Sequence, residues 1–285
     1  MSAQQLVWLI TGTTSGLGLE LTLAALRRGD KVIATGRGKS LGKLAELQEK
    51  GAYILELDVT APLETLQEIA KKAVGVYGRI DVLVNNAGYL AGGTLEETSP
   101  ETTLDQFNTN VFGALNVTRA VLPYMREKRT GTIVFVGSVM GWQGVPYNGL
   151  YVSSKWALRG LSETLHAEIS PLGLRSVCVD FGYFRTPVLE AERRTKPVGG
   201  LADYKEIVEK VENLIQATNG NQPGNPVKGV EAIIDIVKGE GLAAGKAFPL
   251  SVALGTDCYT TAKQSTEAAL ARLDEWKELS ASTDF

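Results

Sequence analysis

Short apolar runs recur along the chain at regular intervals. They are rich in Val, Ile and Leu and occupy 6–10, 31–35, 52–57, 80–84, 131–136, 175–180 and 247–254. Longer stretches such as "GLELTLAALRR", "SLGKLAELQEK" and "LETLQEIAKKAVGVY" place apolar residues three or four positions apart. This spacing indicates helices with one buried face, whereas unbroken apolar runs indicate strands buried on both faces. We therefore expect strands and helices to alternate.

The alternation predicts the fold class. Strands that alternate with helices form a parallel sheet covered by helices on both faces. We expect an α/β protein, a single doubly wound Rossmann-like domain with a mainly parallel sheet over residues 1–285. Two of its helices are expected at 101–128 and 151–170. After residue 188 the alternation of strands and helices ends. We interpret the charged helical stretch and loop at 188–226 as a C-terminal substrate lid.

Composition and net charge indicate which kinds of binding partner the protein is expected to lack. The chain has 285 residues, 44% hydrophobic and 21% charged, which is typical of a globular protein. Its net charge of −3 provides no general basic field, so we expect no nucleic-acid partner. No apolar run reaches the roughly 18 residues of a membrane span, and the opening lacks a secretory pattern. We expect a cytoplasmic protein without a membrane span.

Cysteine and histidine usage argues against a metal site. Cys178 and Cys258 are far apart in the sequence, which fits neither a disulfide framework nor the paired spacing of a zinc site. His166 is the single histidine, so a multi-histidine metal centre is excluded. We expect no metal, and we expect His166 to serve helix packing.

A glycine-rich turn joins the first expected strand to the first expected helix. Gly12, Gly16 and Gly18 are spaced G-x-x-x-G-x-G. Glycine allows a sharp turn and a close approach of the backbone to a diphosphate, and the helix start offers unpaired N–H donors to that anion. A phosphate-loop ATPase is the rival for this region because of "GRGKS" at 36–40, but Ile33 stands where that motif requires glycine.

The second expected strand ends in "IATGRGK". An acid at this point favours NAD, whereas an arginine suits a 2′-phosphate. Arg37 offers two donors to that phosphate and Lys39 adds charge nearby, so we expect NADP(H). A solvated basic residue after a strand is the alternative.

The stretch "YVSSKWALRG" places Tyr151 four residues before Lys155. One helical turn brings both side chains to the same face. This spacing alone is common, and taken by itself it favours an ordinary amphipathic helix. The pair gains meaning only from the order of the other motifs.

That order resembles the short-chain dehydrogenase/reductase family over nearly the whole chain, and most of all its 17β-hydroxysteroid dehydrogenase-like branch. The resemblance rests on "TGTTSGLG" at 11–18, "LDV" at 57–59 and "NNAG" at 85–88. It implies the catalytic residues Asn110, Ser138, Tyr151 and Lys155. It implies as cofactor-binding residues Gly12, Thr14, Ser15, Gly16, Leu17, Gly18, Arg37, Asp58, Val59, Asn86, Ala87, Gly88, Tyr151, Lys155, Gly182, Phe184 and Thr186.

One residue departs from the family pattern. Phe181 stands before Gly182 where the family usually has proline, which puts the local backbone path in question. Thr186 is still expected to bind the nicotinamide carboxamide, and Phe181, Tyr183 or Phe184 to shape the pocket.

The resemblance implies an NADPH-dependent carbonyl reductase or alcohol dehydrogenase. Tyr151 would donate the proton, Lys155 would stabilise the phenolate and hold the nicotinamide ribose, and Ser138 would polarise the carbonyl. Asn110 would hold a water that links Lys155 to solvent. In the alternative interpretation Ser138 caps a turn and Asn110 is an ordinary helix residue.

The expected substrate is a hydrophobic small-molecule ketone or aldehyde. It would contact an apolar and aromatic pocket formed by Trp142, Val145, Tyr147, Leu189 and Tyr204. A non-redox NADP(H)-binding protein on the same fold, a sensor, scaffold or cyclase/epimerase, is the alternative. The helices at 101–128 and 151–170 resemble the pair that builds oligomers in the family, so we expect a homodimer or homotetramer.

Overall fold

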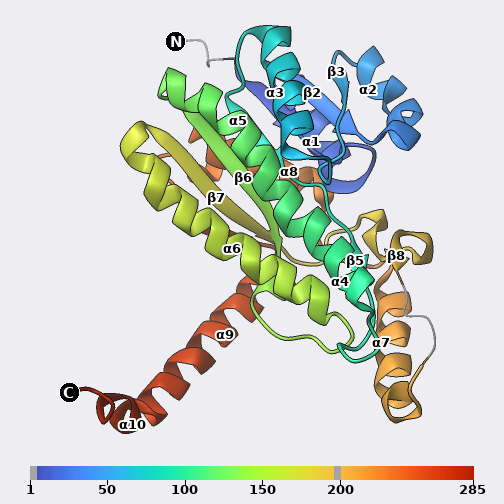
Figure 1. Cartoon of the computed structure of the whole chain (residues 1–285), viewed down its shortest axis with the longest axis vertical. Helices are drawn as coiled ribbons and strands as arrows, with labels where there is room; N and C mark the ends of the chain where they lie inside the picture. The colour runs from blue at the N-terminus through green and yellow to red at the C-terminus, as the bar shows by residue number, and fades with distance from the viewer. Residues whose placement is uncertain (1–4, 196–199) are drawn as a thin grey trace.

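A seven-stranded parallel sheet forms the centre of the computed structural model, which describes residues 5–195 and 200–285, apart from the side chain of Lys39 (Figure 1). Its strand order is β3-β2-β1-β4-β6-β7-β9, and every pairing is parallel. The strands are β1 (Val7–Ile10), β2 (Lys31–Gly36), β3 (Tyr53–Glu56), β4 (Val82–Asn85), β6 (Gly131–Ser138), β7 (Leu174–Phe181) and β9 (Ser251–Leu254). Each of the seven apolar runs is a strand, and the predicted single doubly wound Rossmann-like domain is confirmed.

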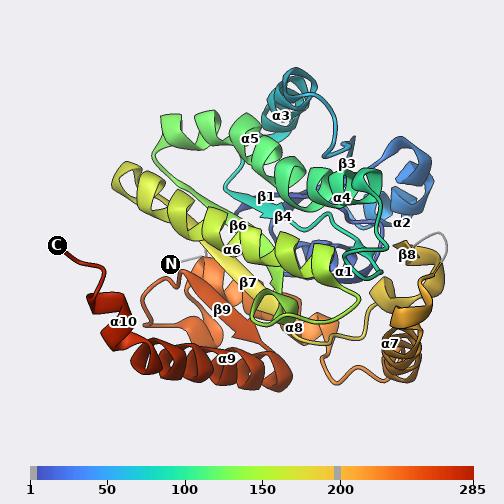
Figure 2. The same cartoon turned by 60° about the horizontal axis from the view of Figure 1, so that its bottom comes forward.

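Helices cover both faces of this sheet, as Figures 1 and 2 show. Successive residues of a strand point to opposite faces, so on β1 Trp8 packs toward one side and Leu9 toward the other. The Trp8 side packs against α1 (Gly16–Arg27) and α8 (Pro226–Lys238). The Leu9 side packs against α3 (Leu63–Tyr77), α5 (Ala114–Lys128) and α6 (Gly149–Ile169). Burial on both faces explains why the strands are continuously apolar.

The prediction of a single long helix at 101–128 is wrong in one respect. The segment consists of α4 (Pro100–Phe107), a π-helical turn (Asn108–Gly113) and α5. Buried Asn110 lies in this turn and binds backbone groups of Tyr89, an interaction between distant segments that helical periodicity does not reveal. The stretch at 40–50 is likewise divided between the end of a 3₁₀ segment (Gly38–Leu44) and the short α2 (Ala45–Glu49).

The segment after β7 contains α7 (Lys205–Thr218) and the two-residue strand β8 (Arg194–Thr195). β8 pairs in parallel with β5 (Leu90–Ala91), which follows β4. Neither strand is apparent in the hydrophobic pattern, since each has only two residues. Their pairing brings the segment 188–195 beside the carboxyl ends of the central strands.

The last helices, α9 (Thr256–Glu275) and α10 (Lys277–Ala281), follow β9 and extend away from the body of the molecule (Figure 1). Cys258 and Ala262 on the first turns of α9 are buried, whereas Leu270 and Leu273 are exposed. No helix within the described ranges is long and apolar enough to cross a lipid bilayer.

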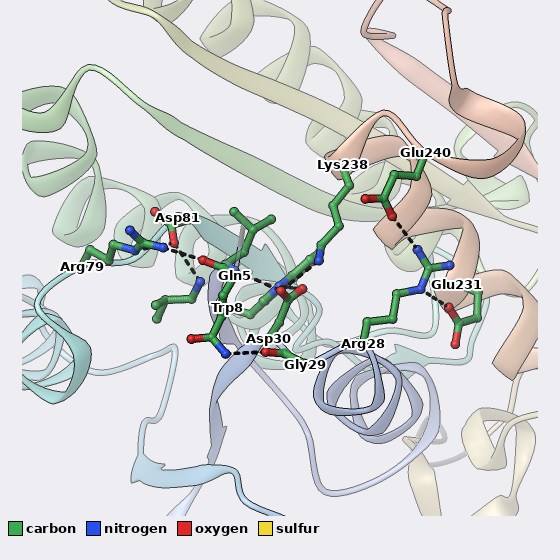
Figure 3. A network of polar contacts seen from close by, with 12 residues as sticks. Gln5, Trp8, Arg28, Gly29, Asp30, Arg79, Asp81, Glu231, Lys238 and Glu240 are labelled. Carbon is green, nitrogen blue, oxygen red and sulfur yellow. Dashed lines mark hydrogen bonds and ion pairs between the residues drawn. The ribbon is translucent and has the colours of Figure 1, made fainter. Parts of the chain in front are cut away.

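A buried polar cluster at the amino ends of the strands fastens helices of the Trp8 side to the sheet (Figure 3). The Asp30 carboxylate accepts hydrogen bonds from Trp8 Nε1 at 2.9 Å and Lys238 Nζ at 2.9 Å. Arg28, next to the end of α1, pairs with Glu231 of α8 at 2.8 Å. These charges satisfy one another at the amino ends of the strands.

Candidate active site

A cavity of about 630 Å³ opens at the carboxyl ends of the parallel strands. The loops that follow β1, β2, β4, β6 and β7 line it. The strand order reverses direction between β1 and β4, and such a switch point is where open parallel sheets bind ligands. The order of the strands therefore explains why the cavity lies at this point of the sheet.

The glycine turn forms one wall of the cavity. Gly12 and Gly16 have φ values of +70° and +58°, a left-handed conformation that side chains with a Cβ rarely adopt. Gly18 does not line the cavity. A Cβ built on Gly18 would lie 2.4 Å from Gly12 O and 2.5 Å from Asn86 Nδ2, so this glycine permits α1 to pack against the turn.

The "NNAG" segment holds the glycine turn in place. Asn86 Nδ2 donates to the carbonyl oxygens of Thr11 at 2.8 Å and Gly12 at 3.0 Å. The backbone N–H of Ala87 donates to Thr11 Oγ1 at 3.0 Å. Asn86, Ala87 and Gly88 also line the cavity, so the segment both supports the turn and contributes to the wall.

The start of α1 is suited to an anion. Ser15 is the N-cap residue, but its side chain makes no capping hydrogen bond, and the first turn contains no acid. Gly16 and Leu17, at the start of the helix, line the cavity. Unpaired N–H groups and the positive end of the helix dipole favour a phosphate at such a place.

The residues that the sequence predicts to bind the adenosine part of the cofactor line the same cavity. Arg37 is exposed, precedes the 3₁₀ segment after β2 and lines the cavity. The predicted contribution of Lys39 falls on a side chain outside the described part. Asp58 also lines the cavity, and its Oδ1 accepts from Thr60 N at 2.9 Å and Thr60 Oγ1 at 2.8 Å.

Tyr151 and Lys155 lie one turn apart on α6, as their spacing predicts, and both line the cavity. Lys155 is buried, and its Nζ lies 5.4 Å from the centre of the Tyr151 ring. The same ammonium donates to Val136 O of β6 at 2.7 Å. This bond connects Lys155 to the strand that carries Ser138.

Ser138 ends β6 and lines the cavity. Its Oγ accepts a hydrogen bond from Met140 N at 3.2 Å, which caps the 3₁₀ turn Val139–Gly141. The capping role considered from sequence is therefore real. It coexists with a position in the cavity wall, where the hydroxyl retains its own donor.

Asn110 lies behind the cavity and is absent from its lining. Its Nδ2 donates to Tyr89 O at 3.0 Å and Ser154 Oγ at 3.1 Å, and its Oδ1 accepts from Tyr89 N at 3.1 Å. The side chain thus connects the π-helical turn to α6 beside Lys155. The water relay expected for Asn110 stays a prediction.

Phe181 continues β7 where the family pattern has proline. It pairs in register with Leu254 of β9, and its ring meets the Phe184 ring edge to face at 4.9 Å between centroids. Phe181, Gly182, Tyr183, Phe184 and Thr186 all line the cavity. Phe181 is therefore the last residue of β7, and aromatic side chains form part of the cavity wall.

Gln222 is a wall residue that the sequence does not reveal. Its side chain is 1% exposed, and its Nε2 lies 3.5 Å from Thr186 O. Its Oε1 has no hydrogen-bond partner among the residues that the structure describes. A buried amide oxygen without a partner is costly, so a donor from a ligand beside Thr186 would satisfy it.

All predicted site residues except Gly18 and Asn110 line the cavity. Of the five residues expected to contact the substrate, Leu189 alone lines the cavity. Trp142 instead donates from Nε1 to Asp180 at 3.0 Å, and Tyr204 from its hydroxyl to Glu96 at 2.6 Å. Val145 and Tyr147 lie outside the lining, and burial followed by the Glu212 carboxylate raises the pKa of Tyr147 far above its usual range.

Comparisons with known proteins agree with this geometry. Oxidoreductase BOA17 of Botryotinia fuckeliana is 32% identical over 276 residues, covering 96% of this chain and 97% of the relative. A short-chain dehydrogenase from Streptomyces avermitilis superposes with a TM-score of 0.87 at 34% identity, covering 100% of both chains. A variant of actinorhodin polyketide ketoreductase solved with NADPH gives a TM-score of 0.72 at 30% identity, covering 88% of this chain and 95% of that one.

The family model described as short chain dehydrogenase matches residues 6–197, which include the glycine turn, "NNAG" and the Tyr151–Lys155 pair. The chain is therefore an oxidoreductase of the short-chain dehydrogenase family.

Proposed function

We propose that this protein is an NADPH-dependent carbonyl reductase, or in reverse an alcohol dehydrogenase, that acts on a ketone or aldehyde of a hydrophobic small molecule. One observation carries the proposal: Ser138, Tyr151 and Lys155 line the same cavity as the glycine turn. Proton-transfer groups and a dinucleotide-binding turn thus share one space, which is the arrangement that hydride transfer requires.

The residues present fit a nicotinamide dinucleotide. The uncapped start of α1 would receive the diphosphate, and Asp58 and Val59 would contact the adenine. The partnerless Oε1 of Gln222 would accept a hydrogen bond from the carboxamide beside Thr186. When bound, the nicotinamide supplies the hydride.

The choice of NADPH over NADH depends on Arg37. Its guanidinium offers paired donors for a 2′-phosphate, and it lies at the end of β2, where the ribose of the cofactor is held in doubly wound folds. The polyketide ketoreductase that resembles this chain was solved with NADPH, which supports the same choice.

Three side chains would handle the proton and the carbonyl. The Tyr151 hydroxyl donates its proton to the carbonyl oxygen, and Lys155 keeps a positive charge beside the phenolate that forms. Ser138 Oγ donates to the same oxygen and fixes its position. The bond from Lys155 Nζ to Val136 O holds the ammonium in a constant relation to the strand that ends at Ser138.

Apolar side chains favour a hydrophobic substrate. Val139, Met140, Tyr183, Val188 and Leu189 line the cavity, and the first three belong to the same apolar cluster as Tyr151. The structural relative named a polyketide ketoreductase supports reduction of a ketone. We assign the segment 188–226 as the substrate lid, because Val188 and Leu189 come from it and β8 fastens it beside β5.

A panel of hydrophobic and small charged ketones tests this function. We expect the purified chain to consume NADPH with hydrophobic ketones and aldehydes and to use NADH poorly. Tyr151→Phe should lower kcat at least about 100-fold, because general acid catalysis contributes roughly that much or more. It should leave the Kd for NADPH, measured by titration, within about threefold of the wild-type value.

Retained turnover by Tyr151→Phe would remove the proton-donor role. Activity confined to small charged acids would overturn the substrate class. Tight NADPH binding without turnover on any carbonyl would favour the non-redox alternative, a sensor, scaffold or cyclase/epimerase.

A further inference from the structure

Arg193 reaches from the lid segment to the glycine turn. Its Nη1 donates to Ser15 Oγ at 2.7 Å, although the two residues are far apart in the sequence. Both residues line the cavity, Ser15 at the start of α1 and Arg193 in the 3₁₀ turn Ala191–Arg193. A cation thus lies against the part of the turn that is suited to an anion.

The charges around Arg193 leave this cation available to a ligand. Arg193 Nε pairs with Glu190 Oε2 at 3.1 Å, and the side chains are 40% and 45% exposed, so water screens the pair. Glu192 also lines the cavity, while the neighbouring Arg194 binds Glu212 on the lid helix at 3.0 Å. Ser15 itself is neutral, and the first turn of α1 has no acid.

We propose that Arg193 binds the diphosphate bridge of the dinucleotide, so that the bound cofactor holds residues 188–195 against the glycine turn. The assignment rests on the proposed cofactor. The diphosphate would sit against the start of α1, and the guanidinium that now donates to Ser15 Oγ would donate to a phosphate oxygen. Such a fork of N–H donors matches phosphate oxygens, and the bond gains strength because both partners are charged.

The two arginines of the cavity then have separable roles. Arg37 recognises the 2′-phosphate, which NADPH has and NADH lacks. Arg193 recognises the diphosphate, which both cofactors and ADP-ribose share. Adenosine 2′-phosphate contains the first group and lacks the second, so it distinguishes the two arginines.

Calorimetric titration of the full chain without substrate tests this assignment. We expect Arg193→Gln to raise the Kd for NADPH, NADH and ADP-ribose by about tenfold each, the equivalent of about 1.4 kcal/mol. The Kd for adenosine 2′-phosphate should stay within about twofold. Arg37→Gln should show the opposite pattern, with weaker binding of NADPH and adenosine 2′-phosphate and unchanged binding of ADP-ribose.

Two further variants control for structure. Glu190→Gln removes the acid that pairs with Arg193 and should leave the Kd for ADP-ribose unchanged or lower it. Arg193→Lys keeps the charge and loses the fork, so its Kd should lie between the wild-type and Arg193→Gln values. Because Arg193 is half-exposed, thermal unfolding of the unliganded variants should match the wild type.

The outcomes separate this inference from the proposed function. If the wild-type chain binds no nicotinamide dinucleotide, both are wrong. If the wild type binds and Arg193→Gln binds ADP-ribose equally well, the Arg193 assignment alone is wrong. Equal weakening of adenosine 2′-phosphate and ADP-ribose by Arg193→Gln would also overturn it, since that pattern indicates a distorted site.

Discussion

Cys178 and Cys258 are both fully buried, and their sulfur atoms contact Asp180. Burial, followed by the Asp180 and Asp257 charges, raises the pKa of the Cys258 thiol to about 12. Burial and the Asp180 charge also raise the pKa of Cys178. In an unfolded chain the pKa of a cysteine thiol is about 8.5.

The raised thiol pKa values predict a loss of stability at alkaline pH. Below about pH 8.5 the thiols are protonated in both states and their contribution is constant. Above it the unfolded chain releases protons that the folded chain keeps, so the free energy of unfolding falls by about 1.4 kcal/mol per pH unit for each thiol. For Cys258 this loss continues until the pH passes its folded pKa of about 12.

Urea unfolding between pH 7 and 10 measures this slope. The double variant Cys178→Ala, Cys258→Ala controls for tyrosine and lysine titration, and the wild type should lose stability faster than this variant above pH 8.5. Equal slopes would contradict the prediction. As a second check, a thiol reagent at pH 8 should modify the native chain slowly and the unfolded chain rapidly.

Single residues differ in how well the sequence predicts their roles. The sequence placed Gly12, Tyr151 and Lys155 at the cavity correctly: Gly12 belongs to a local glycine turn, and the Tyr151–Lys155 pair gained its meaning from the order of the other motifs. Arg193 and Gln222 reach the cavity only through tertiary packing, and neither belongs to a local pattern. Nothing adjacent to them in the sequence could have indicated their position.

At the scale of elements, Asp180 joins β7 to α6, the helix that carries Tyr151 and Lys155. Its buried carboxylate accepts from Arg159 Nη2 of α6 at 2.9 Å, from Trp142 Nε1 at 3.0 Å and from the backbone N–H of Ser138 at 3.2 Å. The Arg159 guanidinium also lies 3.4 Å above the Trp142 ring. Arg159 is one turn beyond Lys155, so the charged stripe of α6 continues into this cluster.

Asp180→Asn should lower the free energy of unfolding by about 3 kcal/mol, since it leaves the mostly buried Arg159 without a counter-charge. Adding Arg159→Met should recover part of the loss, with a coupling energy above about 1 kcal/mol in a double-mutant cycle. Lys50→Met, which removes the exposed pair with Glu46, should cause no measurable change. Strictly additive losses in urea unfolding would show that the pair does not act as a unit.

Element prediction succeeded where burial imposes a period. The seven central strands and the helices over them bury whole faces, and their apolar residues therefore recur at fixed intervals. β5 and β8 have two residues each, too few to show a period. The π-helical turn depends on Asn110 contacting Tyr89, a residue whose position is set by β4 and not by the helix itself.

At the scale of the whole molecule, the two ends of the sheet are specialised differently. At the amino ends, charges such as Asp30 and Lys238 neutralise each other and hold helices to the sheet. At the carboxyl ends, Arg37, Arg193 and Lys155 line a cavity. The charges at the amino ends are thus paired with one another, while the cations that line the cavity remain available to a ligand.

Large apolar side chains are also exposed on the two helical segments that resemble the oligomer-building pair. Phe112 of the π-helical turn is 46% exposed and Trp156 of α6 is 52% exposed. Both would be covered if these helices met a second copy of the chain, which removes apolar area from water. We therefore expect a homodimer or homotetramer through this face.

Sedimentation equilibrium tests the arrangement. The wild type should have the mass of two or four chains, and Trp156→Glu combined with Phe112→Glu should shift it to the mass of one chain, because charges buried without partners oppose association. Leu273→Glu on α9, where the leucine is 68% exposed, is the matched control and should leave the mass unchanged. Dissociation by Leu273→Glu alone would instead assign the interface to α9, and a monomeric wild type would exclude the oligomer.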